Sequence, residues 1–161
     1  MKKLLITFMA ALVLVGCGGS NNSNQTKEKE AFVFETHGTT IKMNEEVSSI
    51  LKALGKEQDY FEAKSCAFDG MDKTYTYAGF KLVTYPKDDK DYVNQVVLQD
   101  DTVSTKEGVS IGDTKAKVEE TYGKDYKDKN GAYVYTQGDS TLEFIFDGDS
   151  VSSITYTAIT K

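Results

Sequence analysis

Six short runs rich in β-branched and aromatic residues, bounded by turn residues, most constrain what this chain can fold into. Three of them follow one helix pattern and three follow another. The first three are "KTYTYAG", "FKLVTYP" and "YVNQVVLQD", and the second three are "GAYVYTQ", "STLEFIFD" and "SVSSITYTA". Short runs separated by Gly, Asp and Asn are typical of antiparallel strands joined by tight turns. The sequence therefore predicts a domain rich in antiparallel sheet.

A helix pattern precedes each set of three runs. Residues 44–55 carry apolar residues at i, i+3, i+4 and i+7, which form one stripe, and Asn44 is the expected N-cap. Residues 114–123 form a second helix pattern with a thinner apolar face, in which Thr114 is the expected N-cap and Gly123 the expected stop. A short strand is expected before each helix, over residues 39–43 and 108–111.

The two halves of this pattern match piece by piece. The helices match at one offset, as in Gly55 and Gly123 (123 − 55 = 68), and the strands at another, as in Tyr75 and Tyr133 (133 − 75 = 58). Self-similarity of this kind indicates internal repetition. The predicted fold class is α+β, with two tandem repeats that each pack a helix on an antiparallel β-sheet. The strands of the repeats could join in one continuous curved sheet.

A strand, a capped helix "IGDTKAKVEETYG" and an antiparallel run ending in "DGDSVSSITYT" resemble the BamE/BLIP-like superfamily. The resemblance covers about residues 32–161, and the doubled unit is similar to the tandem β-lactamase inhibitor proteins of that group. The whole chain also resembles small lipoproteins of Gram-positive bacteria. This resemblance implies a BLIP/BamE-like helix-on-sheet fold, but it assigns no binding residue to this chain.

The N-terminus has the pattern of an export signal. Lys2 and Lys3 precede an uncharged run over residues 4–15, whose length at 1.5 Å per residue is roughly 18 Å and too short to span a bilayer. The run ends in Leu-Val-Gly-Cys, which resembles the lipobox of bacterial lipoproteins, so Cys17 is the expected site of lipidation. A stable anchor of this kind generally requires at least two acyl chains, such as palmitate.

These patterns predict how the chain is divided into parts and where in the cell the protein is located. A tether without large apolar residues follows the cysteine and precedes the folded part. We therefore expect a cell-membrane lipoprotein, anchored through lipid on Cys17 and facing the extracytoplasmic side. The predicted parts are a signal peptide (1–16), the lipidated Cys and flexible linker (17–31), a first α+β unit (32–100) and a second α+β unit (101–161).

The net charge of the chain limits the classes of partner that the protein is expected to bind. The chain has 19 basic and 25 acidic residues, and removal of Lys2 and Lys3 with the signal leaves a formal charge of −8 (17 − 25). Nucleic-acid binding depends on neutralising phosphates with Lys and Arg, so a nucleic-acid partner is excluded from the prediction. A polybasic surface for anionic lipid is equally absent from the sequence.

The sequence contains few residues suited to catalysis or to metal binding. Cys66 has three open interpretations: a packed or incidental thiol, a nucleophile, and a thiol with a redox or intermolecular role. A nucleophile requires a base or cation to lower its pKa. The only histidine, His37, is expected in a turn between two strands. The fragments "DKNG" at 128–131 and "DGD" at 147–149 are similar to parts of calcium loops, yet they lack the regular ligand spacing and closing glutamate. We therefore predict turns there, and no metal, cofactor or catalytic residue.

Four tyrosines are the candidate binding residues. They lie at period 2 in equivalent strands, so each pair shares one face of a sheet. They could belong to the core, or they could form a recognition surface, since tyrosine is enriched at interfaces. The expected function is a non-catalytic binding module for a protein or cell-wall ligand, using the sheet face and the long loops 59–72 and 86–92. The alternatives are an assembly component of an envelope complex and, ranked lower, a Cys66-dependent enzyme or a β-lactamase inhibitor. The four tyrosines are Tyr75, Tyr77, Tyr133 and Tyr135.

Overall fold

A computed structural model describes residues 30–160 of the 161-residue chain. The predicted signal peptide, Cys17 and nearly all of the tether lie outside the described residues. The first half of the domain contains β1 (Val33–Thr36), β2 (Thr39–Lys42), α1 (Ser48–Leu54), β3 (Asp59–Lys64), β4 (Met71–Tyr77), β5 (Phe80–Lys87) and β6 (Lys90–Leu98). The second half contains α2 (Lys115–Tyr122), β7 (Lys127–Lys129), β8 (Ala132–Gln137), β9 (Ser140–Asp147) and β10 (Ser150–Ala158).

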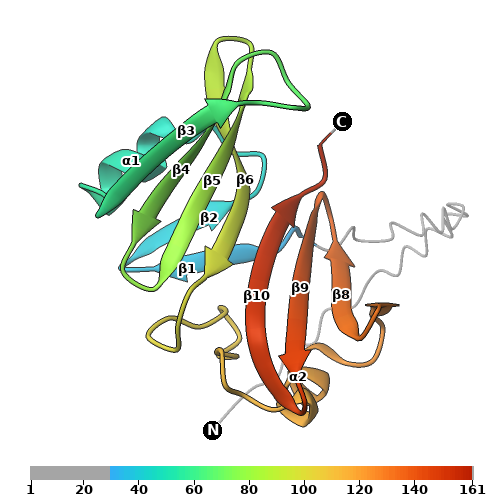
Figure 1. The fold of residues 1–161 in the computed structure, drawn as a ribbon. Helices are drawn as coiled ribbons and strands as arrows, with labels where there is room; N and C mark the ends of the chain where they lie inside the picture. Colours follow the sequence, from blue (N-terminus) through green and yellow to red (C-terminus); the bar gives the residue numbers. More distant parts are fainter. Residues whose placement is uncertain (1–29, 161) are drawn as a thin grey trace, which may run out of the picture.

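Eight of the strands form one antiparallel sheet in the order β3-β4-β5-β6-β10-β9-β8-β7 (Figure 1). Each half contributes four strands connected by hairpins, and the halves join where β6 pairs with β10. That junction, which we call the seam, holds four residue pairs, from Ile154↔Leu98 to Thr157↔Gln95. Because both seam strands are hydrogen-bonded on each side, they are central strands of a continuous sheet.

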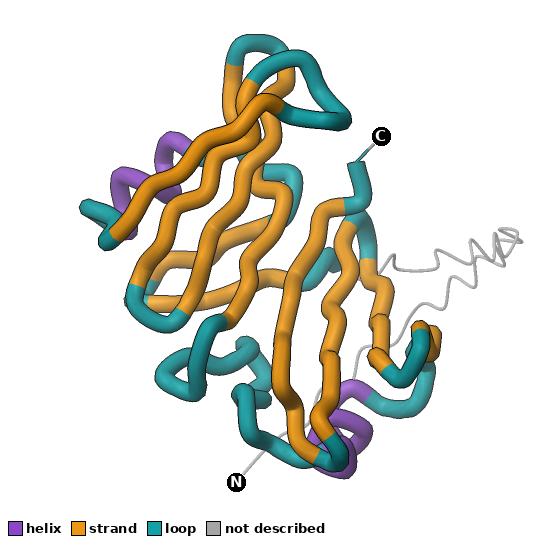
Figure 2. Tube along the Cα trace, in the orientation of Figure 1, coloured by secondary structure: helices purple, strands orange, loops and turns teal. Residues whose placement is uncertain are grey.

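The predicted fold class is wrong: the domain is mostly β and does not consist of two helix-on-sheet repeats. The helices have seven and eight residues, and Ile50 and Val118 are the only side chains that each buries within its own bounds. Figure 2 shows how little of the chain is helical. Helices this short cannot cover an eight-stranded sheet, so an additional element has to cover part of it.

The hairpin β1–β2 is that element. It crosses behind the large sheet in Figure 1 and closes through a turn at His37 and Gly38, as predicted for the histidine. Phe34 and Ile41 are paired in this hairpin and are fully buried. The Phe34 ring lies 5.1 Å from the ring of Phe80 in β5 and 5.9 Å from that of Tyr156 in β10. One side chain of the hairpin therefore packs on both halves of the sheet.

The two predicted helices fared differently. The helix at 114–123 is confirmed: the Thr114 side chain accepts a hydrogen bond from the Lys117 amide at 3.2 Å, and Gly123 ends the helix with φ +80°. The first helix begins at Ser48, after Val47 rather than Asn44, and has no side-chain cap. Asn44 adopts the left-handed conformation with φ +62° and lies outside the helix.

The strand predicted at 108–111 is absent from the described secondary structure. This segment forms turns, and Val109 is fully buried with its amide donating to Thr105 Oγ1 at 3.0 Å. The Thr105 hydroxyl thus accepts the hydrogen bond that a neighbouring strand would otherwise accept from the Val109 amide. The alternating pattern of this segment therefore does not produce a strand. The strand predicted at 39–43 is present as β2.

The segments that lead into the two helices bond to the seam strands in the same way. The Asn44 amide donates to Val93 O of β6 at 2.9 Å, and the Gly112 amide donates to Val151 O of β10 at 2.8 Å. The offsets are those of the sequence halves (112 − 44 = 68; 151 − 93 = 58). Beyond the four seam pairs, the segment before α1 therefore takes the place of β10 as the partner of β6. The segment before α2 takes the place of β6 as the partner of β10. Duplication of the chain itself stays a prediction.

Candidate functional site

The large sheet has one covered and one uncovered face. The uncovered face carries many polar side chains and a few apolar ones, such as Phe61 and Ile145, which are 63 % and 43 % exposed. No element within residues 30–160 crosses this face (Figure 1). Threonine is especially frequent there, which suits the pleated surface of a strand. One row of paired residues crosses six strands in the order Thr74, Val83, Gln95, Thr157, Thr141 and Thr136.

The structure places the four candidate tyrosines on the covered face instead. Tyr77 is 9 % exposed and Tyr135 is 4 % exposed, and both belong to the core. Their hydroxyls donate to the carbonyls of Gly55 and Gly123, the glycines that end the two helices, at 3.4 and 2.8 Å. The other two tyrosines are partly buried and pack against the same core. These contacts favour the interpretation of the tyrosines as core residues.

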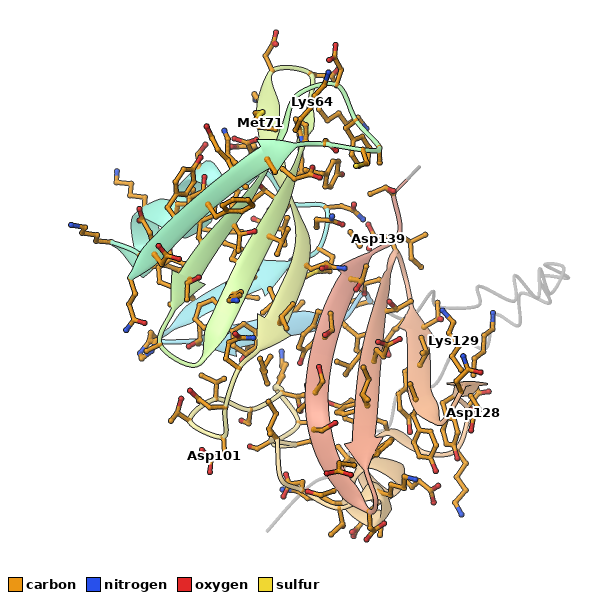
Figure 3. All side chains as sticks on the ribbon, viewed as in Figure 1. Lys64, Met71, Asp101, Asp128, Lys129 and Asp139 are labelled. Atoms are coloured by element: carbon orange, nitrogen blue, oxygen red, sulfur yellow. The ribbon has the colours of Figure 1, made fainter. Side chains whose placement is uncertain are left out.

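A second location on the fold gathers polar and aromatic side chains from separate parts of the chain. Where β6 and β10 diverge beyond the seam, an open hollow of about 340 Å³ lies at one end of the sheet. We call this hollow the seam pocket. In Figure 3, the labelled residue Asp139 marks its position beside the end of β10, at the same end of the sheet as Lys64 and Met71. The pocket is lined by Asn44, Tyr85, Lys87, Asp88, Tyr92, Asp139 and Ile159.

Asn44 connects the elements that form the seam pocket. Its Nδ2 donates to Asp139 Oδ2 at 2.9 Å, and its Oδ1 accepts from the Tyr85 hydroxyl at 3.1 Å. Burial raises the pKa of Tyr85 above its ordinary value, so the phenol stays protonated and keeps this donor. Asparagine tolerates positive φ better than most residues. The left-handed conformation at Asn44 therefore directs one short amide toward strand β5 and the β8–β9 turn together.

Aromatic stacking fixes the wall of the seam pocket. The Tyr85 ring is stacked with the Phe68 ring at 4.7 Å and with the Tyr92 ring at 5.8 Å between centroids. Phe68 belongs to the loop 65–70 that joins β3 to β4. Aromatic pairs at such separations contribute about 0.5–1.5 kcal/mol beyond their buried area. Both segments expected to bind, 59–72 and 86–92, therefore meet at this end of the sheet. The prediction of long loops is wrong, because only 65–70 and 88–89 lie between strands.

An ion pair joins β4 to β6 on the other side of the β5–β6 hairpin. Lys73 Nζ lies 2.7 Å from Asp91 Oδ2, and both side chains are about three-quarters buried (27 % and 22 % exposed). The hydrogen bond that Lys73 donates to Asp91 raises the pKa of Lys73, so the ammonium stays charged. A smaller hollow of about 220 Å³ surrounds this pair and is lined by residues 69–71 and 89–91 among others.

The structure assembles no catalytic set among the residues it describes. Cys66 is exposed and free, in the loop 65–70, while His37 lies in the β1–β2 turn. Within residues 30–160, no group of three or more His, Cys, Asp or Glu is placed to hold a metal ion. The fragments at 128–131 and 147–149 form the β7–β8 and β9–β10 turns, as predicted. In the first turn, Asp128 Oδ1 accepts from the Gly131 amide at 2.8 Å.

Sequence reasoning missed Asn44 and Asp139 as site residues. Asn44 is predicted as a helix cap, and Gln137-Gly138-Asp139 is a predicted turn between two of the β-rich runs; asparagine and aspartate are common in these roles. The partner of each lies 95 residues away in the chain, so no local pattern could join them. The only available signal was that asparagine is enriched at positions with positive φ.

Comparisons with protein-family models, curated proteins and solved structures found no match for this chain. None of the helices in the described part of the chain is long and apolar enough to cross a membrane.

Proposed function

We propose that this protein is a cell-envelope lipoprotein, anchored through Cys17, that acts as a non-catalytic binding module for a protein or cell-wall ligand. The observation that carries the proposal is the seam pocket. There, the β2–α1 connection, the β5–β6 hairpin, the β8–β9 turn and the end of β10 meet around one hollow. Convergence of several loops on a rigid sheet is a common arrangement for binding sites.

The chemistry of the seam pocket suits a ligand with hydroxyl and amide groups. Lys87 and Asp88 supply a donor and an acceptor at its rim, and Tyr92 supplies an aromatic face beside a phenol. One carboxylate oxygen of Asp139 is held by Asn44, which fixes the orientation of the other. Polypeptides and cell-wall polymers both carry hydroxyl and amide groups. The proposed site therefore binds by hydrogen bonding and stacking, without a nucleophile or base.

The point at which the chain enters the domain supports a location of the seam pocket near the membrane. Gln137 Nε2 donates to the Glu30 carbonyl, and a Cβ on Gly138 would lie 2.9 Å from the Ala31 amide nitrogen. The chain thus enters the domain beside the turn that contains Asp139. A tether of thirteen residues, as predicted for 18–30, would have an r.m.s. reach of roughly 20 Å. A lipid on Cys17 would hold the seam pocket close to the membrane surface.

The test of the binding function is capture of ligand by variants of the pocket rim. We expect the chain from residue 18 onward to bind either isolated cell wall or detergent-solubilised envelope proteins of its own organism. Lys87→Ala and Tyr92→Ala should each raise the Kd about tenfold, because each removes a direct contact worth about 1.4 kcal/mol. Lys129→Ala is the matched control, since this exposed lysine lies on β7, at the far edge of the sheet (Figure 3).

Equal binding by all three variants would contradict the seam pocket as the site. Hydrolytic or transferase activity of the purified chain would contradict a non-catalytic role, and an effect of Cys66→Ser on that activity would assign it to the thiol. Stoichiometric co-purification with one envelope complex would indicate the alternative, an assembly component.

The anchor has its own expected result. Cys17→Ala should abolish incorporation of a labelled fatty acid and leave the precursor with residues 1–16 attached, because the thiol is the acceptor of the lipid. The measurement is metabolic labelling followed by mass spectrometry of the purified protein. Cys66→Ser is the control and should leave both labelling and processing unchanged. Unchanged processing of the Cys17 variant would contradict the lipoprotein assignment.

A further inference from the structure

The two edges of the large sheet differ in how they are protected. Strand β7 has three residues, Lys-Asp-Lys, and a short, lysine-bearing strand is a usual way to prevent edge pairing. Strand β3 has six residues, all exposed, and Phe61 is 63 % exposed on the uncovered face. Figure 1 shows β3 at the outer margin of the sheet. The β3 edge is therefore a long strand with an apolar side chain and no neighbour on its outer side among residues 30–160.

The phase of the β3–β4 ladder identifies which backbone groups the edge presents. The Ser65 amide donates to Gly70 O at 3.0 Å, and the pairing continues in register from Lys64↔Met71 to Asp59↔Thr76. Hydrogen-bonded pairs alternate with non-hydrogen-bonded pairs in an antiparallel ladder. Phe61 and Ala63 therefore bond to β4. The amide and carbonyl groups of Tyr60, Glu62 and Lys64 point away from the sheet.

We propose that β3 pairs with β3 of a second copy of this chain, antiparallel and centred on Phe61. A two-fold axis perpendicular to the sheet would then place Phe61 opposite its own copy, with Tyr60 opposite Glu62 of the other chain. The outward amide and carbonyl groups of Tyr60 and Glu62 would form the hydrogen-bonded pairs on either side. The two eight-stranded sheets would join into one, with the uncovered faces on the same side.

Charge and overlap select this register over its neighbours. A shift that centres the pairing on Glu62 places two carboxylates directly opposite each other, which is destabilising. Shifts that centre it on Tyr60 or Ala63 leave three residues of each strand paired instead of five, because β3 spans only Asp59–Lys64. Centring on Phe61 keeps five residues paired, with no two charged side chains of like sign directly opposite.

The symmetry also agrees with an anchored protein, although the inference does not depend on the proposed binding function. A two-fold axis perpendicular to the sheet keeps both covered faces on one side. The β1–β2 hairpin lies on that face, so both chains would enter their domains from the same side. Two tethers could therefore reach one membrane.

The test is disulfide cross-linking in the full chain carrying Cys66→Ser, expressed in its own membrane. Residues in a non-hydrogen-bonded pair have Cα atoms about 4.5 Å apart, within the range that a disulfide can span. Mild oxidation of Phe61→Cys should convert most of the protein to a covalent dimer, at least fivefold more than Asp101→Cys, an exposed position at the opposite end of the domain (Figure 3). The Cys66→Ser parent alone measures any contribution of Cys17.

Adding Glu62→Pro to the Phe61→Cys chain distinguishes cross-linking in a β3–β3 pair from cross-linking through random encounters of two chains. The Glu62 amide points outward, so proline removes no backbone hydrogen bond of the single chain but removes a donor of the proposed pair. The one side-chain bond that it removes, from the Tyr60 hydroxyl to the Glu62 carboxylate, is solvent-exposed. We expect cross-linking to fall to the Asp101→Cys level while the melting temperature stays unchanged. Cross-linking of Phe61→Cys no stronger than that of Asp101→Cys, stronger cross-linking of Ala63→Cys, or insensitivity to Glu62→Pro would each overturn the proposal. Cross-linking of Phe61→Cys to a different protein would overturn it as well.

Discussion

Val96→Asp is expected to lower the free energy of unfolding by about 4 kcal/mol or more, which is a large part of the stability of a small domain. Val96 is fully buried at the seam, where it pairs with Tyr156 of β10. The covered face around this position is apolar, since Leu82 and Ile154 are also fully buried. A carboxylate there would lose its hydration without gaining a partner. Urea unfolding followed by circular dichroism measures the loss.

The matched control is Val97→Asp, one residue further along the same strand. Val97 pairs with Lys81 of β5 and Thr155 of β10 on the uncovered face, and its side chain is partly exposed. Water and the neighbouring lysine can solvate a carboxylate at this position, so we expect a loss of at most about 1 kcal/mol. Losses of similar size at both positions would contradict the assignment of one covered and one uncovered face.

Phe34→Ala is expected to cost about 3–5 kcal/mol, the usual range for removing a buried phenylalanine. The side chain is fully buried and contacts aromatic rings in both halves of the sheet, Phe80 and Tyr156. Its loss would leave a cavity beneath the seam, so both halves should become less stable together. Thermal and urea unfolding should show a single transition displaced to lower temperature and lower urea concentration.

Ile145→Ala is the control for Phe34→Ala. Ile145 is 43 % exposed on the uncovered face, and its truncation should change stability by less than about 1 kcal/mol. If Phe34→Ala cost no more than Ile145→Ala, the hairpin would not be the structural cover described above. If it produced two separate transitions, the halves would fold as independent units.

Much of the local structure could be predicted from the sequence. The six β-rich runs all became strands, because their residues suit a pleated surface and their turn residues allow tight reversals. Asp88 and Asp89, for example, both have positive φ in the β5–β6 turn. The helix that begins after Thr114 has its predicted cap. These features depend on residues close together in the sequence, which is why the sequence alone reveals them.

The overall architecture could not be predicted in the same way. The apolar stripe of residues 44–55 suggested a helix large enough to cover a sheet, but only 48–54 are helical. The β1–β2 hairpin covers the seam region instead, and its short strands gave no signal of the face on which they pack. Whether a strand pattern is covered by a helix or a hairpin depends on contacts between distant residues.

The sequence predicted which segments contribute to the candidate site, but it did not predict which residues line it. The segments 59–72 and 86–92 do meet, since a Cβ on Gly70 would lie 2.9 Å from the Cβ of Pro86. The tyrosines were placed correctly in strands, yet period 2 determines only that they share a face, and not which face is covered. Packing against the helix-ending glycines settles that point in the structure.

Native-state hydrogen exchange at the seam shows whether strands β3 to β10 form one continuous sheet joined between β6 and β10. The amides shared by residues 95–98 and 154–157 are the ones to follow. We expect them to exchange only through global unfolding, as slowly as the most protected amides of β5 and β9. Faster exchange at the seam than within either half would contradict this arrangement, because the halves would then separate while each remained folded.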